Sequence, residues 1–485
     1  MNQYNWDIFE RIYSDHNFMT GLGGGGFVQD YSKYGAGNYL QVFLALREPE
    51  VCTWVFNAKE FDRSANFISG RLLNDNPWRE RLYRNIEEVT RNYFSAGERF
   101  ITLPLHNFND QKLIIEFCKL YKLQRRHHIM STIANGVVTD GRGHLSNKIR
   151  TAIQNETGIN TDEFEHCWSI LTQVTKMSLR QMKDYAIAKL AKESRNLSTA
   201  QIRSRLHQLH TRYCWLDYQY RGPVAGIEQF EADLEAAKKT NANLQLPEHL
   251  YQIRQKQKTL TKTLHFNRRA RFLVSLAQFV IWQKGFRKDI QYHSFYCYES
   301  LFHELARRRN FENWMLTRLL FPWEIESFIH TGKPTESTLA LRQKMSVLIV
   351  HPHRITIKLG DEAKKFWKSL NVSGNFSEIR EVKGQCAFAG RAQGVVKIIQ
   401  IPADMVKMQN GNILLSQATS PDLLPAMKKA SAIVTNMGGL ICHAAITARE
   451  LQIPCIVGTI RATLVFKDGD FVEVDAANGI IRKIN

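Results

Sequence analysis

Near the end of the chain, one histidine stands four residues after a pair of glycines, at an expected helix start. The short apolar, β-branched run 432–435 predicts a buried strand, and Gly438 with Gly439 supplies the permissive backbone of a tight turn. A helix should begin near residues 441–442, so His443 lies in its first turn, where free N–H groups and the positive end of the helix dipole hold anions. Imidazole is a neutral nucleophile near neutral pH and a good leaving group once protonated. The pattern therefore predicts a histidine that carries a phosphoryl group.

The predicted helix has a face of small residues. Ala444, Ala448 and Leu451 fall at i, i+4 and i+7, a spacing that lets the helix lie close to a sheet. Pro454 should end the helix, and residues 455–457 have the composition of the next strand. The sequence therefore predicts a strand, a glycine turn, a helix and a second strand.

Three further blocks in the same region have the order and spacing of a known domain. They are glycine-punctuated strands at 384–396, a strand followed by Thr-Ser-Pro-Asp at 412–422, and hairpins at 467–479. With the histidine turn, these blocks make residues 384–485 as a whole resemble the swivelling phosphohistidine domain of the PEP-utilising enzymes. That family includes phosphoenolpyruvate synthase, pyruvate phosphate dikinase and rifampin phosphotransferase. The resemblance implies that His443 is the residue phosphorylated.

Other residues match the family's site, and their roles stay open. The phosphate-loop support implied by the resemblance consists of Gly438, Gly439, Cys442, Thr419 and Arg449. Thr419 is equally suited to capping the turn that follows it. Arg449 is equally suited to a surface ion pair with Glu450 or Asp422.

Two positions depart from the family pattern. Ile441 stands where the plant-type dikinases carry a regulatory threonine, so control through phosphorylation of that position is not expected here. Asn436 replaces an acidic residue often found at this place, and the sequence assigns it no role.

The resemblance also implies partners. In the full-length family enzymes the histidine shuttles between an ATP-grasp domain that charges it and a second domain that discharges it. No Walker-type loop or ATP-grasp pattern precedes the carrier region, so we expect no ATP-grasp domain in it, and because the chain ends at Asn485 we expect no pyruvate-binding barrel after it. We expect no tightly bound cofactor. ATP and Mg²⁺, or PEP, should be the phosphate donor on a partner, and an ATP-grasp nucleotide-binding protein is the expected partner.

A second glycine-rich segment is the other candidate phosphate loop. Glycine amides can cradle a phosphate, and Gly21–Gly26 contains five glycines. The segment lacks an ordered strand before it and a lysine after it. A flexible surface loop or hinge is therefore the favoured interpretation, and a phosphate cradle is the alternative.

Composition limits the class of protein. The chain of 485 residues has 44% hydrophobic residues, no long uncharged apolar run and no signal-peptide pattern, so we expect a cytoplasmic, multidomain protein without a membrane segment. Its 8 cysteines occur singly, without C-x-x-C spacing, which is typical of free thiols in a reducing compartment. No histidine cluster has companions at zinc spacing, so no metal site is expected.

The expected fold class is multidomain α+β. Residues 1–110 should form an N-terminal α/β segment of unknown role, and residues 111–371 a mainly helical linker or acceptor domain. Residues 372–377 are the expected hinge. Residues 378–485 are expected to form the C-terminal β/β/α swivelling phosphohistidine domain that the resemblance implies.

The helical part contains two candidate binding surfaces. Around residues 210–223 it resembles the helical domain of rifampin phosphotransferase, which binds the phosphate acceptor. The candidates for lining an acceptor pocket are Trp215, Tyr218 and Tyr220. The alternative is that these rings belong to the core. The basic run 254–271 is either an anion site for a phosphorylated substrate, nucleic acid or an acidic partner, or a solvated helix face.

Two classes of function follow. The formal net charge of +19 lies mostly in residues 1–375, because residues 376–485 hold 12 Lys or Arg against 9 Asp or Glu. In the first class, the chain is a phosphotransferase component that carries a phosphoryl group on His443 from its donor to an unidentified small-molecule or phosphate acceptor. In the second, it is a non-catalytic basic protein that binds nucleic acid or an acidic partner and retains the carrier domain. No nucleic-acid-binding signature supports the second class.

Overall fold

The structure is a computed structural model and describes residues 6–13, 17–37, 40–49, 51–136, 144–159, 164, 167–168, 170–218, 220, 222–240, 242–370, 379–400, 402–419, 423–436, 438 and 442–484. The chain divides into two compact units, Met1–Val137 with Gln173–Val372, and Val138–Thr172 with Ser373–Asn485. The protein is multidomain α+β, as expected. The division after Val372 falls within the predicted hinge, and residues 371–378 lie outside the described residues.

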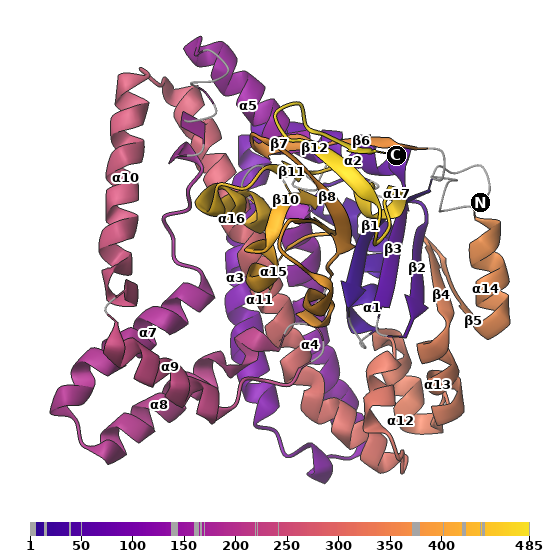
Figure 1. The fold of residues 1–485 in the computed structure, drawn as a ribbon. Coiled ribbons are helices and arrows are strands. Elements are labelled where there is room, and N and C mark those ends of the chain that lie inside the picture. Colours follow the sequence, from indigo (N-terminus) through magenta and orange to yellow (C-terminus); the bar gives the residue numbers. More distant parts are fainter. Residues whose placement is uncertain are drawn as a thin grey trace. The chain divides into compact units, whose positions relative to one another are not determined.

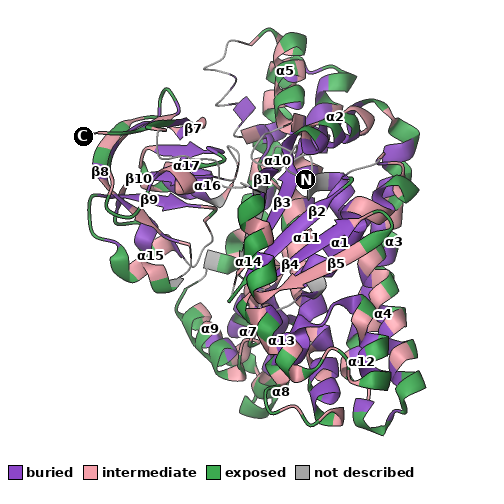
Figure 2. Cartoon of the chain, turned by 90° about the vertical axis from the view of Figure 1, so that its right-hand side faces the viewer, coloured by how far each residue is buried: buried purple, intermediate pink, exposed green. Residues whose placement is uncertain are grey.

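The first unit contains an antiparallel five-stranded sheet (Figure 1). Its strands are β1 (Trp6–Tyr13), β2 (Phe43–Glu48), β3 (Val51–Asn57), β4 (Ser346–His351) and β5 (Arg354–Leu359). Their order is β1-β3-β2-β4-β5, so two hairpins meet at the β2–β4 pair, where Phe43 lies opposite Val350. Strands β2 and β3 are almost wholly buried, as the purple colour in Figure 2 shows.

This pairing corrects the predicted boundary at residue 110. Strands β4 and β5 belong to the part predicted to be mainly helical, yet they complete the sheet that the N-terminal strands begin. The free edge of β2 carries N–H and C=O groups that need a partner. Local sequence periodicity does not reveal that this partner lies about 300 residues further along the chain.

Most of the rest of the first unit is helical. Its helices are α1 (Phe18–Gly25), α2 (Ala58–Asn74), α3 (Asn76–Ile101), α4 (Asp110–Ser131), α7 (Leu179–Glu193), α8 (Thr199–Tyr213), α9 (Ile227–Lys239), α10 (Leu246–Thr263), α11 (Arg268–Arg308), α12 (Ile325–Thr331), α13 (Glu336–Lys344) and α14 (Gly360–Ser369). Side chains of Asn57, Asp75, Asn109 and Asn267 cap the starts of α2, α3, α4 and α11 by accepting a backbone N–H. Within the described ranges, no helix has the length and apolar character needed to cross a bilayer.

The glycine run forms a buried helix, so the prediction of a flexible surface loop is wrong. Helix α1 continues into a π-helical turn, η1 (Gly26–Asp30), and both lie against the sheet. A Cβ atom on Gly23 would come within 2.5 Å of Trp54, and one on Gly24 within 2.7 Å of Phe43. The glycines are therefore spacers that let a helix approach large aromatic side chains. Their amide groups make backbone hydrogen bonds of the helix, since Gly21 N donates to Asn17 O and Gly26 N donates to Leu22 O.

Three long helices, α3, α4 and α11, pack against one another in the first unit (Figure 1). Gly97 of α3 permits a close crossing, since a Cβ atom there would lie 3.0 Å from both Cys297 Sγ and His293 Cε1 of α11. At 41 residues, α11 is about 60 Å long. The path of α11 through the first unit therefore positions the side chains that pack along its length.

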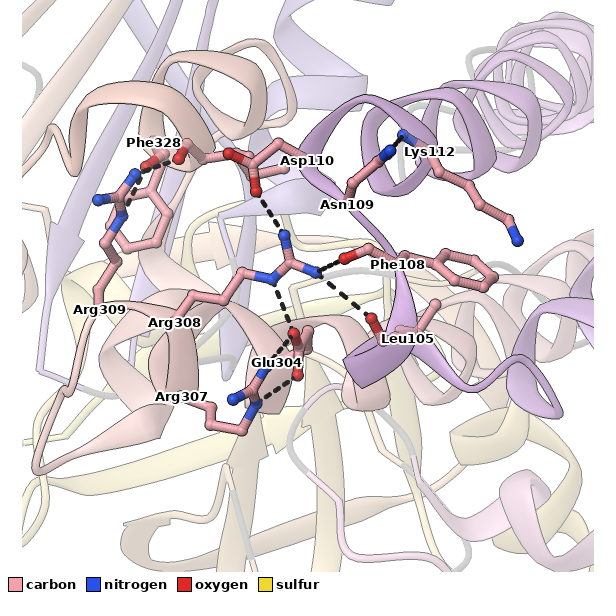
Figure 3. Close-up of polar contacts among 11 residues, drawn as sticks. Leu105, Phe108, Asn109, Asp110, Lys112, Glu304, Arg307, Arg308, Arg309 and Phe328 are labelled. Carbon is pink, nitrogen blue, oxygen red and sulfur yellow. Dashed lines mark hydrogen bonds and ion pairs between the residues drawn. The ribbon is translucent and has the colours of Figure 1, made fainter.

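Arg308, at the end of α11, binds the beginning of α4 (Figure 3). Its guanidinium donates to Asp110 Oδ1 and to the Phe108 carbonyl oxygen, each at 2.5 Å, and to Glu304 Oε1 at 2.7 Å. Glu304 also accepts two hydrogen bonds from Arg307, both at 2.8 Å. Burial opposes ionisation of Glu304, but these hydrogen bonds outweigh burial and hold its pKa below the ordinary value of 4.5.

The second unit contains a mixed eight-stranded sheet. Its strands are β6 (Glu381–Lys383), β7 (Gln385–Phe388), β8 (Arg391–Ile398), β9 (Asn412–Ser416), β10 (Ala430–Thr435), β11 (Cys455–Val457), β12 (Phe471–Asp475) and β13 (Ile480–Lys483). The order is β6-β13-β12-β8-β9-β10-β11-β7, in which β8 to β11 run parallel and the remaining pairs are antiparallel. The helices of this unit are α5 (His144–Thr157), α15 (Leu424–Met427), α16 (His443–Leu451) and α17 (Ala462–Val465).

Alternating strand residues supply two separate cores in the second unit. Leu414 and Ile433 belong to the core that contains α16. Their strand neighbours Leu415 and Val434 belong to the core on the other face, which contains α17. Both faces of β9 and β10 are therefore covered, which explains why these strands are apolar without interruption.

The tight contact at Gly23 predicts the effect of a single methyl group. Gly23→Ala should lower the free energy of unfolding by about 1–3 kcal/mol, because the ring of Trp54 is buried and cannot yield freely. Gly70→Ala is the matched control. No atom lies within 4 Å of its added methyl in α2, so that variant should be about 0.5–1 kcal/mol more stable. Chemical denaturation measures both; equal effects at the two positions would contradict the spacer role.

The low pKa of Glu304 predicts a pH-dependent contribution to stability. A carboxylate whose folded pKa is depressed contributes stability above its unfolded pKa, and this contribution is lost as the pH falls through the folded value. Glu304→Gln should therefore destabilise the protein by a constant amount above about pH 4.5, and the difference from wild type should shrink at lower pH. Exposed Glu312→Gln should give no such difference in urea denaturation series between roughly pH 3 and 7, the range over which carboxyl groups titrate.

Candidate functional site

The predicted strand, glycine turn and helix are present in the second unit. Strand β10 ends at Thr435, Cys442 is the N-cap of α16, and His443 is the first residue of this nine-residue helix. Gly438 has a φ of +111°, and a Cβ atom there would lie 2.7 Å from Cys442 Sγ. Only glycine suits this position. Gly439 and the position of the His443 side chain lie outside what the structure describes.

Helix α16 lies close to the sheet on a face of alanines. Ala444, Ala445 and Ala448 are each at most 1% exposed, and the helix contacts β7, β10 and β11. The predicted small-residue stripe therefore packs as expected, with Leu451 at its half-buried end. Thr447, predicted on another side, is also buried.

Arg449 binds the backbone of the neighbouring strand. Its Nε donates to the Ala387 carbonyl oxygen of β7 at 3.1 Å. Among the described side chains it forms no ion pair with Glu450, and Asp422 lies outside the described residues. Arg449 thus bonds a backbone carbonyl of β7 and does not pair with Glu450, and its pairing with Asp422 stays a prediction. A phosphate contact from Arg449 stays a prediction.

Asn436, which the sequence left without a role, connects the loops after three parallel strands. Its side chain is 1% exposed. Nδ2 donates to Gln417 Oε1 after β9 at 2.8 Å and to Thr463 Oγ1 at 2.6 Å. Oδ1 accepts the Thr463 N–H at 2.9 Å, and the Asn436 carbonyl accepts the Ile460 N–H, after β11, at 2.8 Å. The residue thus fixes the backbone from which the turn to His443 departs.

An amide is suited to this position where a carboxylate is not. Asn436 must donate two hydrogen bonds and accept others in a buried place, and a carboxylate can only accept. The signal that could have identified the residue was its place directly after an apolar strand, combined with a departure from the family's acidic residue.

The parallel strands bring the turn and its neighbouring loops to one edge of the sheet. Strands β8 to β11 end on the same side, so the loops that follow β9, β10 and β11 lie together there. Thr419, in the loop after β9, is half-buried, and residues 420–422 lie outside the described residues. Its role in capping or in phosphate binding stays a prediction. The free N–H groups at the start of α16 can hold an anion at this edge.

The predicted acceptor-pocket residues lie in packed surroundings in the first unit. Trp215 is 5% exposed, its ring centroid lies 4.8 Å from that of His293, and its Nε1 donates to Arg212 O at 2.8 Å. Tyr218 is buried and donates to Glu299 Oε2 at 2.5 Å. Tyr220 meets the ring of Tyr292 edge to face. The structure therefore favours the alternative interpretation, in which these rings are core.

The basic run 254–271 is divided between two helices. Residues 264–267 separate the part in α10 from the part in α11. Lys256, Lys258 and Lys262 are exposed on α10, whereas Arg269 donates to the Leu73 carbonyl oxygen. A role in anion binding stays a prediction. In the described ranges, no group of three or more His, Cys, Asp or Glu side chains is arranged to hold a metal ion.

Comparison with known families identifies the region around the histidine turn. Residues 408–479, from just before β9 to just after β12, match the family described as PEP-utilising enzyme, mobile domain. The segment that contains His443 therefore matches the mobile, phosphohistidine domain of the PEP-utilising enzymes.

The chain shares partial homology with phosphoenolpyruvate synthases. It is 38% identical over 172 residues to the probable phosphoenolpyruvate synthase of Archaeoglobus fulgidus, covering 34% of this chain and 22% of that protein. It is 50% identical over 100 residues to that of Methanothermobacter thermautotrophicus, with 21% and 15% covered. It is 48% identical over 133 residues to the phosphoenolpyruvate synthase of Deinococcus radiodurans, with 27% and 16% covered. The matches thus span about a fifth or less of these relatives.

Among solved structures, aconitase X from Thermococcus kodakaraensis aligns with 22% of this chain and 98% of that chain at 19% identity. The TM-score of 0.17 is too low to support an argument about fold or function.

The hydrogen bonds of Asn436 predict that its truncation loosens the site. Asn436→Ala leaves buried donors and acceptors unpaired and should lower the unfolding free energy by about 3 kcal/mol. Asn410→Ala, in an exposed turn before β9, should change it by less than about 0.5 kcal/mol. Chemical denaturation measures the unfolding free energies of the two variants, and hydrogen exchange of residues 416–463 measures how far the loops are loosened. Equal stability of the two variants would show that Asn436 does not hold the loops together.

Proposed function

We propose that this chain is a phosphotransferase component that carries a phosphoryl group on His443. The observation that carries the proposal is the position of His443 at the start of α16, inside the segment that matches the mobile domain. Gly438 gives the turn its positive φ, and Asn436 holds the end of β10 in place. Both support a fixed helix start, which is what an imidazole needs if it is to be charged and discharged at a constant geometry.

The charging step requires an attack by imidazole on phosphorus. A ring nitrogen of His443 forms a nitrogen–phosphorus bond while the bond from phosphorus to the donor oxygen breaks, and the donor leaves with that electron pair. The N–H groups at the start of α16 stabilise the negative charge on the phosphoryl oxygens. In the discharge step an acceptor oxygen attacks phosphorus, and the ring nitrogen leaves as neutral imidazole.

The proposed donor is ATP with Mg²⁺, or PEP, bound to a partner protein. The similarity to phosphoenolpyruvate synthases supports this class of donor. An ATP-grasp protein is the proposed partner, because phosphoryl transfer from ATP needs cationic groups around the phosphates. The glycine run does not supply a phosphate loop, since its amides at Gly21 and Gly26 donate within the helix. The acceptor is a small molecule or a phosphate.

Transfer between two stations requires the carrier unit to move. The chain passes between its two compact units after Val137, after Thr172 and after Val372, and the last of these divisions falls in the segment 372–377 proposed as the hinge. A tether makes the second encounter intramolecular, and a short linker gives effective concentrations on the order of millimolar. A carrier joined in this way can be charged by a partner and still deliver to a nearby acceptor.

The proposal predicts a phosphohistidine that depends on one residue. The purified chain is incubated with labelled ATP and Mg²⁺, or with labelled PEP, each with and without a candidate ATP-grasp protein. Label that is labile to acid and stable to alkali should appear only when the donor protein is present, and His443→Ala should remove at least about 99% of it, as expected for loss of a covalent nucleophile.

The control is His353→Ala, which removes an exposed histidine of the first unit and should leave labelling unchanged. Labelling that persists in His443→Ala would refute the carrier role. Labelling of the chain alone by ATP would place the donor site within this protein. Absence of label under every condition would favour the non-catalytic binding protein.

A further inference from the structure

A line of buried polar side chains in the first unit is not explained by the carrier function. On α4, Gln124, His127 and His128 follow one another at i, i+3 and i+4, and each is at most 3% exposed. They therefore share one face of the helix. Polar side chains of this kind are seldom buried unless they have partners.

Helix α11 presents a matching line. Gln283, Arg287 and Gln291 fall at i, i+4 and i+8, and Gln283 is 1% exposed. Helices α4 and α11 contact one another, and Gln291 Nε2 donates to His128 Nδ1 at 3.0 Å across that contact. The two lines thus face each other and form one polar seam, defined here as Gln124, His127, His128, Gln283, Arg287 and Gln291.

The seam contains more hydrogen-bonding groups than its own members satisfy. Gln124 has no partner for either atom of its amide, and the Gln283 Nε2 and Arg287 Nε groups have none. His128 Nε2 is also unpaired. Because His128 Nδ1 accepts from Gln291, the proton of the neutral ring lies on Nε2, which makes it a further donor. Each buried unpaired group costs about 1–3 kcal/mol.

The charge of the seam is positive. Burial, reinforced by the charge of Arg287, lowers the pKa of His127 to about 3 and holds the pKa of His128 well below its ordinary value, so both rings are neutral at physiological pH. The neighbouring Arg125 is neutralised by Asp30, to which its Nε donates at 2.6 Å. Arg287 has no carboxylate partner among the described residues. One uncompensated guanidinium therefore lies beside several unpaired donors.

Two π-helical turns adjoin the seam. The first is η1 (Gly26–Asp30), and the second is η4 (Thr132–Gly136), which continues α4 directly and contacts α11. Turns of this type are rare and occur often at functional sites, because they widen the helix and redirect side chains. Their presence next to α4 is a second sign that this region was shaped for a ligand.

We infer that the polar seam binds a small oxyanion, a carboxylate or a phosphate group, between α4 and α11. Arg287 supplies the opposite charge, and Gln124, Gln283 and His128 Nε2 supply donors to the oxygens. The unpaired acceptor atoms Gln124 Oε1 and Gln291 Oε1 suit a hydroxyl on the same ligand. A singly protonated phosphate and a small hydroxy acid both combine these features. The site does not involve His443 and does not rest on the carrier function.

The test is ligand-dependent thermal stability of the full chain. Inorganic phosphate, glycolate and acetate are titrated separately, and calorimetry follows any probe that raises the Tm. A saturable increase is expected with phosphate or with glycolate, and acetate, which lacks the hydroxyl, should bind more weakly. Phosphate alone or glycolate alone identifies the class of ligand. No saturable effect of any probe up to about 10 mM, where Kd values weaker than 1 mM are still detectable, would overturn the inference.

Variants locate the binding. Arg287→Met should weaken binding at least about tenfold, whereas Lys288→Met removes a charge from the next residue of α11 and should leave it unchanged. Gln124→Leu should also weaken binding about tenfold. If Arg287→Met does not fold, Gln124→Leu alone decides whether the anion binds in the seam. Binding that Arg287→Met and Gln124→Leu leave intact would place the anion elsewhere and overturn the inference. Such a result would not bear on phosphohistidine formation, which is measured separately with His443→Ala.

Discussion

The buried amide of Asn436 is the interaction on which the carrier site depends. It holds three loops at the carboxyl ends of parallel strands, and the turn to α16 departs from this point. A phosphoryl carrier must present its imidazole to two different partners without rebuilding its own backbone. Hydrogen bonds from one buried side chain, together with the positive φ of Gly438, give that rigidity without any contact to the phosphoryl group itself.

In the first unit, the fold depends in the same way on the pairing of strands that are far apart in the sequence. The hairpin β2–β3 is completed by β4 and β5 from far along the chain, so the sheet depends on a pairing between segments about 300 residues apart. The glycine helix α1 then packs on aromatic side chains that this sheet presents. At the other end of α4, Arg308 fixes the end of α11 and so sets the register in which the polar seam is formed. The contacts of Arg308 and the polar seam are thus parts of one helix packing arrangement.

The two units suggest a division of labour. The carrier domain is matched by phosphoenolpyruvate synthases, whereas those relatives share at most about a fifth of their length with this chain. The first unit is basic and contains the polar seam, in which Arg287 Nε has no hydrogen-bond partner. A protein that stores a phosphoryl group on one unit and recognises a small anion on the other would be able to respond to the supply of that anion. The proposed experiments separate these two activities, because neither set of variants touches the other site.

The sequence by itself determined the local parts of this protein. The strand, turn and helix at 430–451 were predictable because glycine alone tolerates the turn, alanines mark a closely packed face, and the apolar run is short. Tertiary structure decided what depends on distant partners. It buried the Gly21–Gly26 helix against Trp54, paired β2 with β4, directed Arg449 to the backbone of β7, and joined α4 and α11 into a polar seam. Local periodicity reports which face of an element is apolar, but not which remote element will cover that face.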